Sequence, residues 1–160
     1  MPILHVQFSA QGQTPTGQTV TVSPTIALLG QGPVVQIVLS VAQAIADQLM
    51  QQGLPVPVPV PGLALIDTGA SATCIDDALA QQLQLPVIDV VNMTSASHAS
   101  TQQNIYPVLI EVMGGIRINV PRAMGANLAP QNLAALIGRD FLQHCTLFYN
   151  GPAGAITLAL

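Results

Sequence analysis

The sequence predicts a mainly β protein with a few short helices. Three observations support this class. Apolar and polar residues alternate over several short runs, which is the pattern of half-buried strands. Half of the 160 residues are hydrophobic, which is enough for a core in a chain of this length. Only 6% of the residues are charged, whereas a disordered chain combines low hydrophobicity with high net charge.

Strands are expected where short runs of β-branched residues alternate with polar ones. The expected strands are residues 3–9, 18–23, 34–39, 87–93, 105–113, 116–120, 146–149 and 155–160. Turns or loops are expected at residues 11–17, 94–104, 121–130 and 150–154. The segment 94–104 is wholly small and polar, so it predicts a hairpin with a long, hydrated tip.

A helix and a proline-rich connector interrupt the strands. In residues 40–50 the apolar residues recur every four positions, and Ser40 and Gly53 suit the two ends of a helix. Residues 54–62 (LPVPVPVPG) predict an extended connector, because proline lacks the N–H that a central strand needs. The same run could instead recruit a proline-reading partner. We expect both elements to form an insertion at about residues 40–62 of a single domain that spans the chain.

The composition argues against several classes of function. Three arginines and a net charge of -4 leave no basic patch for nucleic acid. No apolar run reaches the roughly 20 residues of a membrane span, and the N-terminus lacks a basic, apolar leader. We therefore expect a cytoplasmic protein, in which Cys74 and Cys145 are free thiols. The histidines lack metal-ligand spacing, and no metal or cofactor is expected.

The segment Asp67-Thr68-Gly69-Ala70-Ser71 directly follows an apolar run that predicts a strand. Its carboxylate stands where the strand ends in a turn. Gly69 lets backbone N–H groups approach the carboxylate, and Thr68 offers a hydroxyl that can hold the loop. Taken alone, these five residues favour a plainer interpretation, in which Asp67 caps a turn through its own backbone hydrogen bonds.

A second motif, Leu136-Ile137-Gly138-Arg139-Asp140, lies towards the end of the chain. Two apolar residues before a glycine and a charged pair after it suggest a strand that runs under the first loop and into a helix. The alternative is an ordinary helix boundary, with short helical segments at 131–137 and 139–144 on either side of Gly138.

Together, the two motifs resemble those of the retroviral-type (retropepsin-like) aspartyl proteases, in particular their short bacterial members. The resemblance runs from about residue 34 to residue 160 and implies a retropepsin-like acid-protease half-barrel with short helices. The residues that it implies for the site are Asp67 (catalytic), Thr68, Gly69 and Ala70 (support of the active-site loop), Ile137, Gly138, Arg139 and Asp140 (structural helix motif), and Ser95, Ala96, Ser97 and His98 (flap).

By this resemblance, a chain with one such motif works only as a twofold homodimer. Aspartic-protease chemistry needs two carboxylates that share one proton, one acting as base toward a water and the other as acid toward the scissile carbonyl. The second carboxylate would be Asp67 of the partner subunit, on the twofold axis. We therefore expect a hydrolase, an aspartic endopeptidase that acts on peptides or proteins at acidic pH. The alternative is a catalytically silent dimeric binding module of the same fold.

The sequence departs from the family pattern in two places. In the retroviral enzymes an acidic residue four positions after the catalytic aspartate meets the helix arginine, but here that position is Ser71, so Arg139 needs another partner. The candidate partners are Asp76, Asp77 and Asp140. The expected flap, about residues 93–106, has no glycine at its tip. The resemblance also places the N- and C-terminal strands in a sheet between the two protomers.

Overall fold

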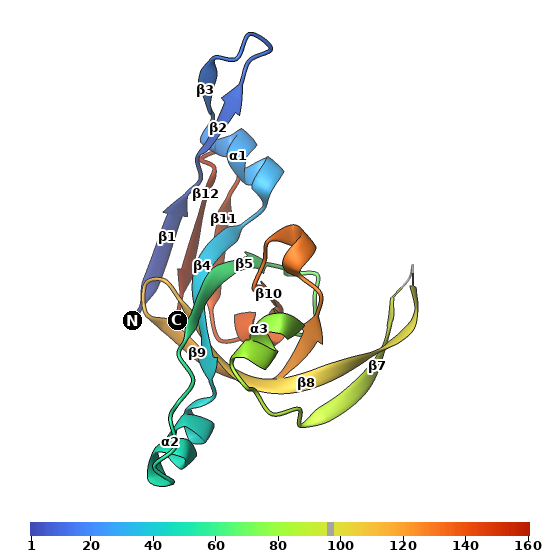
Figure 1. The fold of residues 1–160 in the computed structure, drawn as a ribbon. Helices are drawn as coiled ribbons and strands as arrows, with labels where there is room; N and C mark the ends of the chain where they lie inside the picture. Colours follow the sequence, from blue (N-terminus) through green and yellow to red (C-terminus); the bar gives the residue numbers. More distant parts are fainter. Residues whose placement is uncertain (96–97) are drawn as a thin grey trace.

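The computed structural model describes residues 1–95 and 98–160 and is built mainly of strands, with short helices, as the sequence predicts (Figure 1). The main sheet has the order β4-β5-β10-β6-β9-β8-β7, and a further pairing of β4 with β8 closes its first six strands into a barrel. Its members are β4 (Val34–Val41), β5 (Val60–Ile66), β6 (Cys74–Asp76), β7 (Asp89–Ser95), β8 (His98–Val112), β9 (Ile116–Ala126) and β10 (Ala135–Ile137).

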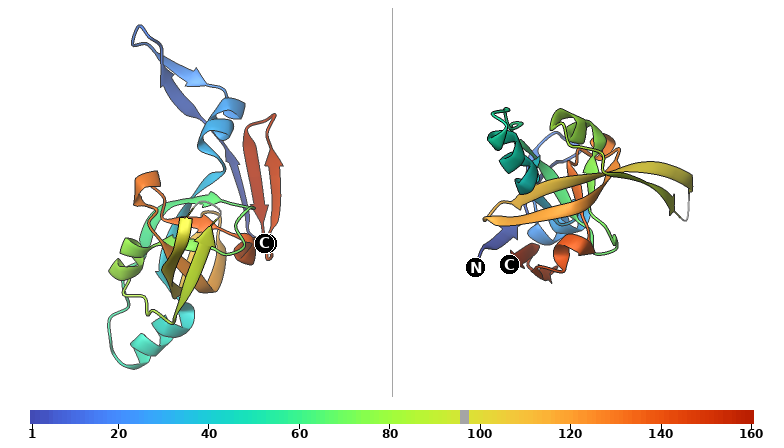
Figure 2. Two further views of the ribbon diagram at one scale, coloured as in Figure 1. Left: turned by 90° about the vertical axis from the view of Figure 1, so that its right-hand side faces the viewer. Right: turned by 90° about the horizontal axis from the view of Figure 1, so that it is seen from below.

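Two smaller sheets flank the barrel. One has the order β1-β12-β11, formed by β1 (Ile3–Gln7), β12 (Ala155–Ala159) and β11 (Thr146–Asn150). The terminal strands β1 and β12 therefore pair within the chain, and β1 and β11 are the two edges of their sheet. The other is the hairpin of β2 (Ala10–Gln13) and β3 (Thr19–Val22). This hairpin projects away from the barrel in Figure 1 and in the left-hand view of Figure 2.

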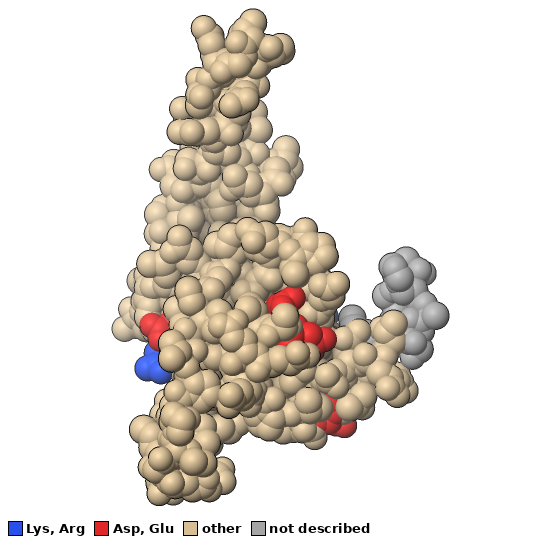
Figure 3. All heavy atoms as spheres, in the orientation of Figure 1, with Lys and Arg blue, Asp and Glu red and all other residues tan. Residues whose placement is uncertain are grey.

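The helices are short and lie outside the barrel (Figures 1 and 2). They are α1 (Pro24–Gln31), α2 (Gln43–Gln51), α3 (Asp77–Gln82), α4 (Arg139–Leu142) and the 3-10 turn η1 (Ala129–Gln131). None of the helices in the described part of the chain has the length and apolar character needed to cross a membrane. The face drawn in Figure 3 is mostly uncharged, in keeping with the low content of charged residues.

The core fills the barrel because each strand alternates between buried and more exposed residues. In β5 and β10, Ala64, Ile66, Ala135 and Ile137 are buried, whereas the residues between them are only half-buried. The β1-β12-β11 sheet adds apolar side chains to the same cluster, among them Leu158, which has no exposed surface. The two sheets therefore share one hydrophobic core.

The strand β10 corrects one of the two expectations for residues 131–137. These residues do not form a helix, because Ala135–Ile137 inserts between β5 and β6, parallel to the first and antiparallel to the second. Residue 135 pairs with Ala64 of β5, so segments far apart in the sequence lie side by side. The alternative expectation, a strand that runs under the first loop into a helix, describes the structure.

The helix and the connector expected at residues 40–62 have different bounds in the structure. The helix α2 starts at Gln43, with Ala42 as its N-terminal cap, because Ser40 and Val41 belong to β4 and pair with β8. The strand β5 begins at Val60, so the connector is shorter than residues 54–62. Pro61 is accommodated because, among the described strands, β4 alone pairs with β5 at this point; β10 joins further along, at Ala64.

Several loops expected from polar or proline residues are strands instead. The turn expected at 11–17 contains most of β2, and β9 runs through Pro121 to Ala126. The hairpin tip expected at 94–104 is largely strand, since β7 ends at Ser95 and β8 begins at His98. The helix α1 was not expected, although Ser23 caps it and Pro24 begins it.

Shortening Leu158 to alanine should lower the free energy of unfolding by about 2–5 kcal/mol, because its fully buried side chain would leave a cavity in the shared core. The matched control is Leu160→Ala, since Leu160 is 41% exposed and its loss should change stability by less than about 0.5 kcal/mol. Urea denaturation of both variants measures this. Equal losses would show that the core does not extend through β12.

Candidate active site

Asp67 is half-buried and stands at the end of β5, where the chain turns over the end of β10. Its backbone N–H donates to the carbonyl of Ile137 at 2.9 Å, which continues the β5–β10 pairing by one residue. Its carboxylate oxygen Oδ1 accepts hydrogen bonds from the N–H groups of Gly69 (2.9 Å) and Ala70 (3.2 Å). Asp67 thus caps its own turn, and among the described residues no hydrogen bond reaches its Oδ2.

The side chain of Arg139 binds the backbone of the same loop. Its Nη1 donates to the carbonyl oxygens of Thr68 and Gly69, both at 2.8 Å. Arg139 was expected to pair with a carboxylate, but within the described chain it binds backbone carbonyls instead. Ser71, which stands where the retroviral enzymes have an acid, offers no charge, and Nη1 of Arg139 binds the loop backbone in its place.

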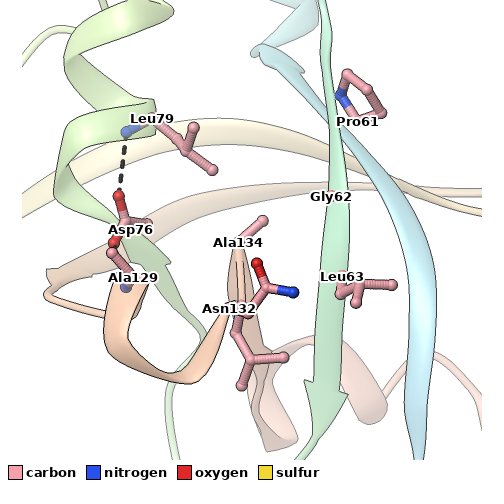
Figure 4. Close-up of a pocket in the computed structure, with 9 residues that line it drawn as sticks. Pro61, Gly62, Leu63, Asp76, Leu79, Ala129, Asn132 and Ala134 are labelled. Carbon is pink, nitrogen blue, oxygen red and sulfur yellow. Dashed lines mark hydrogen bonds between the residues drawn. The ribbon is translucent and has the colours of Figure 1, made fainter.

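The three carboxylates considered as partners of Arg139 are engaged elsewhere. Asp76 is buried, and its two oxygens accept from four backbone N–H groups, two in α3 and two at the start of η1 (Figure 4). Asp77 accepts a hydrogen bond from the hydroxyl of Tyr106 at 2.9 Å. Asp140 lies in the first turn of α4 and binds Thr73.

Thr73 and Asp140 form a polar network beneath the loop. Asp140 accepts from the backbone N–H of Thr73 at 3.0 Å and from its hydroxyl at 2.7 Å. The Thr73 hydroxyl in turn accepts from the N–H of Gly138 at 3.1 Å. Thr73 has no exposed surface, so its side of each of these bonds is shielded from water. The network fastens the far end of the loop to the start of α4.

Gly138 is needed because two backbones touch at this crossing. A Cβ atom at this position would lie 2.5 Å from the carbonyl carbon of Ala72 and 2.9 Å from the nitrogen of Thr73. Real Cβ contacts are never so short, so any side chain here would push the loop away from β10. Gly138, Arg139 and Asp140 therefore act on the loop of Asp67 in three ways: by leaving space, by binding carbonyls and by binding Thr73.

The expected flap residues lie apart from this cluster in the chain, on the β7–β8 hairpin. Ser95 and His98 are paired across the two strands. Ala96 and Ser97 lie outside the described residues. Of the expected site, the structure brings together the loop of Asp67 and the motif at Gly138.

The side chains next to Asp67 on its face of the sheet are apolar. Leu65, Leu136 and Cys74 occupy one row across β5, β10 and β6, on the side facing away from the barrel core. The two leucines are half-buried. Burial raises the pKa of Cys74 to about 11, with smaller contributions from the carboxylates of Asp140 and Asp67. Leu65 lies two residues before Asp67, and alternate residues of an extended chain share a face, so the row adjoins the side of Asp67. The sequence predicted a strand in the apolar run at residues 64–66, but it did not single out Leu65 as a site residue.

The cavity shown in Figure 4 lies at the opposite ends of the same strands. Its volume is about 310 Å³. It is lined by Pro61, Gly62, Leu63, Asp76, Leu79, Ala129, Asn132, Leu133 and Ala134. Pro61, Gly62 and Leu63 lie at the beginning of β5, and residues 132–134 directly precede β10. Asp67 and Gly138, by contrast, follow the carboxyl ends of these two strands. The cavity is therefore separate from the loop of Asp67.

A comparison with protein families identifies the chain. The family model described as "gag-polyprotein putative aspartyl protease" matches residues 60–144, which is more than half of the chain and includes both motifs. The chain belongs to this family, the retropepsin-like aspartyl proteases.

Two solved structures are similar to the chain at low sequence identity. One is the crystal structure of a retropepsin-like aspartic protease from Rickettsia conorii, with 11% identity and a TM-score of 0.43; the match covers 98% of this chain and 90% of that one. The other is the retroviral protease-like domain of Ddi1 from Leishmania major, with 13% identity and a TM-score of 0.39, covering 73% of this chain and 81% of that one. None of the curated proteins compared with the chain matches it.

Replacing Thr73 with valine should lower the free energy of unfolding by about 1–3 kcal/mol, because the isosteric side chain leaves Gly138 N–H and Asp140 short of a buried partner. The control is Thr21→Val, at an exposed position of β3, with an expected change of less than about 0.5 kcal/mol. Thermal and urea denaturation measure both. A Thr73→Val variant as stable as the control would contradict the network.

The raised pKa of Cys74 predicts a loss of stability at alkaline pH. The folded protein keeps this thiol protonated up to about pH 11, whereas the unfolded chain loses the proton near its ordinary pKa of 9.0. The stabilisation is therefore complete below pH 9 and is lost as the pH rises towards 11. Urea denaturation between pH 8 and 11 should give a shallower decline for Cys74→Ala than for wild type. Parallel declines would be inconsistent with the buried thiol.

Proposed function

We propose that the protein is a homodimeric aspartic endopeptidase in which two copies of Asp67 activate water. The observation that carries this proposal is the geometry of Asp67: one carboxylate oxygen is held by loop N–H groups, while the other accepts no hydrogen bond from the described chain. A carboxylate that only capped a turn would not need the close backbone approach at Gly138 or the hydrogen bonds from Arg139 to the loop carbonyls. Family membership supports the same reaction class.

The second carboxylate of the pair must come from another copy of the chain. The described acid with the strongest tie to the loop is Asp140, but both of its oxygens are occupied by Thr73 and by the N–H of Phe141. It lies beneath the loop and serves its structure. A twofold axis passing beside Asp67 would instead bring two identical carboxylates together.

The chemistry then follows from two like charges in contact. Two adjacent carboxylates cannot both ionise, so the pair retains one proton at moderately acidic pH. The ionised member takes a proton from a water, which attacks the peptide carbonyl, while the protonated member donates its proton to the carbonyl oxygen. The N–H groups of Gly69 and Ala70 keep the carboxylate in place during this exchange.

The apolar row beside Asp67 supports peptides with large apolar side chains as substrates. Leu65 and Leu136 are paired neighbours on the face away from the core, in the row next to Asp67. A peptide that lies along this face would bury its side chains against the two leucines, and such burial is worth about 1.5–3 kcal/mol for a leucine-sized group. The β7–β8 hairpin would cover the bound peptide from the other side.

Wild-type protein should cleave an unstructured peptide library between pH 4 and 7, with apolar residues enriched around the cut, and Asp67→Asn should abolish cleavage. The amide cannot serve as the base, so the rate should fall to background as read by mass spectrometry. The control is Asp47→Asn, an exposed carboxylate on α2 whose side chain binds Gln43. It should cleave like wild type.

Mixing subunits tests the shared site in the same assay. If each site needs two copies of Asp67, adding excess Asp67→Asn protein should reduce the activity with the square of the wild-type fraction. A linear fall would contradict the shared pair, and equal cleavage by wild type and Asp67→Asn would rule out Asp67 chemistry.

A further inference from the structure

The β7–β8 hairpin leaves the barrel as a two-stranded ribbon. Met124 of β9 pairs with Ile105, and beyond this point the described residues of β8 pair only with β7. The ribbon extends away from the barrel both in Figure 1 and in the right-hand view of Figure 2. Two strands alone are marginally stable in water, so the direction of the ribbon depends on contacts at its base.

The pairing is irregular where the ribbon meets the barrel. The register between β8 and β9 shifts between Tyr106 and Val108, so that Pro121 and Arg122 together oppose Pro107. Such a bulge bends the strand and interrupts the ladder of hydrogen bonds. The two prolines remove further backbone donors at the same place. The base of the ribbon is therefore the point at which it can pivot.

A partly buried hydrogen bond joins this point to α3. The Tyr106 hydroxyl donates to Asp77 Oδ1 at 2.9 Å, and Asn104 Nδ2 donates to the hydroxyl oxygen at 3.1 Å. Tyr106 is only 2% exposed. Burial raises the pKa of Tyr106, so the hydroxyl keeps its proton and remains a donor at neutral pH. Because the acceptor is a carboxylate, this bond is stronger than one between neutral groups.

Gly125 on β9 makes room for this contact. A Cβ atom at this position would overlap Asp77 Oδ1 and would lie 2.9 Å from Cε2 of Tyr106. Three elements, β8, β9 and α3, therefore meet around one hydroxyl–carboxylate pair. The pair fits the space that the missing side chain leaves.

Asp77 is itself rigidly supported. It is the first residue of α3, directly after Asp76, whose carboxylate binds four backbone N–H groups. The strand β6 leads from the loop of Asp67 into this corner. The hydroxyl of Tyr106 therefore ties the base of the ribbon to the segment that continues the active-site loop.

We propose that Tyr106 and Asp77 are positioning residues that set the angle of the β7–β8 hairpin relative to the loop of Asp67. Their bond holds the ribbon at the bulge opposite Pro107 and limits its pivoting. Its effect on peptide binding rests on the proposed function, whereas its effect on the hairpin does not. With the bond removed, the ribbon opens more often and a bound peptide is held less tightly.

The test is hydrogen–deuterium exchange on the full chain, comparing wild type with Tyr106→Phe, which keeps the ring and removes the hydroxyl. Exchange at residues 89–92 and 101–105 should rise about tenfold, the effect of losing a hydrogen bond to a charged group. Exchange in β5 should stay within twofold. The matched control is Asp89→Asn, which breaks the exposed Arg122–Asp89 ion pair at the same base and should change exchange less than twofold.

Asp77→Asn is the second variant, since its amide oxygen still accepts the hydroxyl but without charge. Hairpin exchange should rise two- to threefold, and this result decides the matter if Tyr106→Phe does not fold. Peptide cleavage by Tyr106→Phe should show a KM raised several-fold with kcat within twofold. Three results would overturn the proposal. The exchange of the hairpin could be unchanged in Tyr106→Phe, or it could rise by no more than the exchange of β5. The hairpin of the wild-type protein could also already exchange as fast as an unfolded peptide. Altered hairpin exchange in a protein without peptidase activity would sustain the pivot and refute only the proposed function.

Discussion

The contact between Gly138 and the backbone of Ala72 and Thr73 is the constraint on which the candidate site depends. It lets β10 end directly beneath the loop, so that Ile137 can accept a hydrogen bond from Asp67. The same approach places the first turn of α4 within reach of the loop. A side chain at position 138 would separate the two segments, and the bonds on either side of the crossing would lengthen together.

Strands were predictable from the sequence where apolar and polar residues alternate strongly. The segments that were wrongly predicted as helix or loop have physical explanations. Residues 131–137 contain good helix formers, but Ala135–Ile137 has a strand on each side, and tertiary pairing overrides local preference. Pro121 suggested the end of a strand, yet β9 continues because the bulge opposite Pro107 tolerates it. The start of α1 was predictable in principle, because Ser23 is a favourable N-terminal cap and Pro24 suits the first helical position.

The site was only partly predictable, for a different reason. Asp67 and Gly138 belong to motifs whose residue types are restricted by their chemistry and by the space available. The groups that satisfy Arg139 are carbonyl oxygens, which every residue carries, so no residue type marks them. The role of Thr73 was equally unpredictable, because it depends on hydrogen bonds to Asp140 and Gly138, which are neighbours in space and not in the sequence.

The place of β10 in the sheet has a consequence for the order of events during synthesis. This strand is made long after β5 and β6, yet it lies between them, so neither can complete its pairing before residue 137 has been added. Pairings this distant in the chain close large loops and form slowly. A nascent chain that already contains Asp67 therefore lacks the support that shapes its loop. The loop of Asp67 can therefore take its final shape only after Arg139 and Asp140 have been added to the chain.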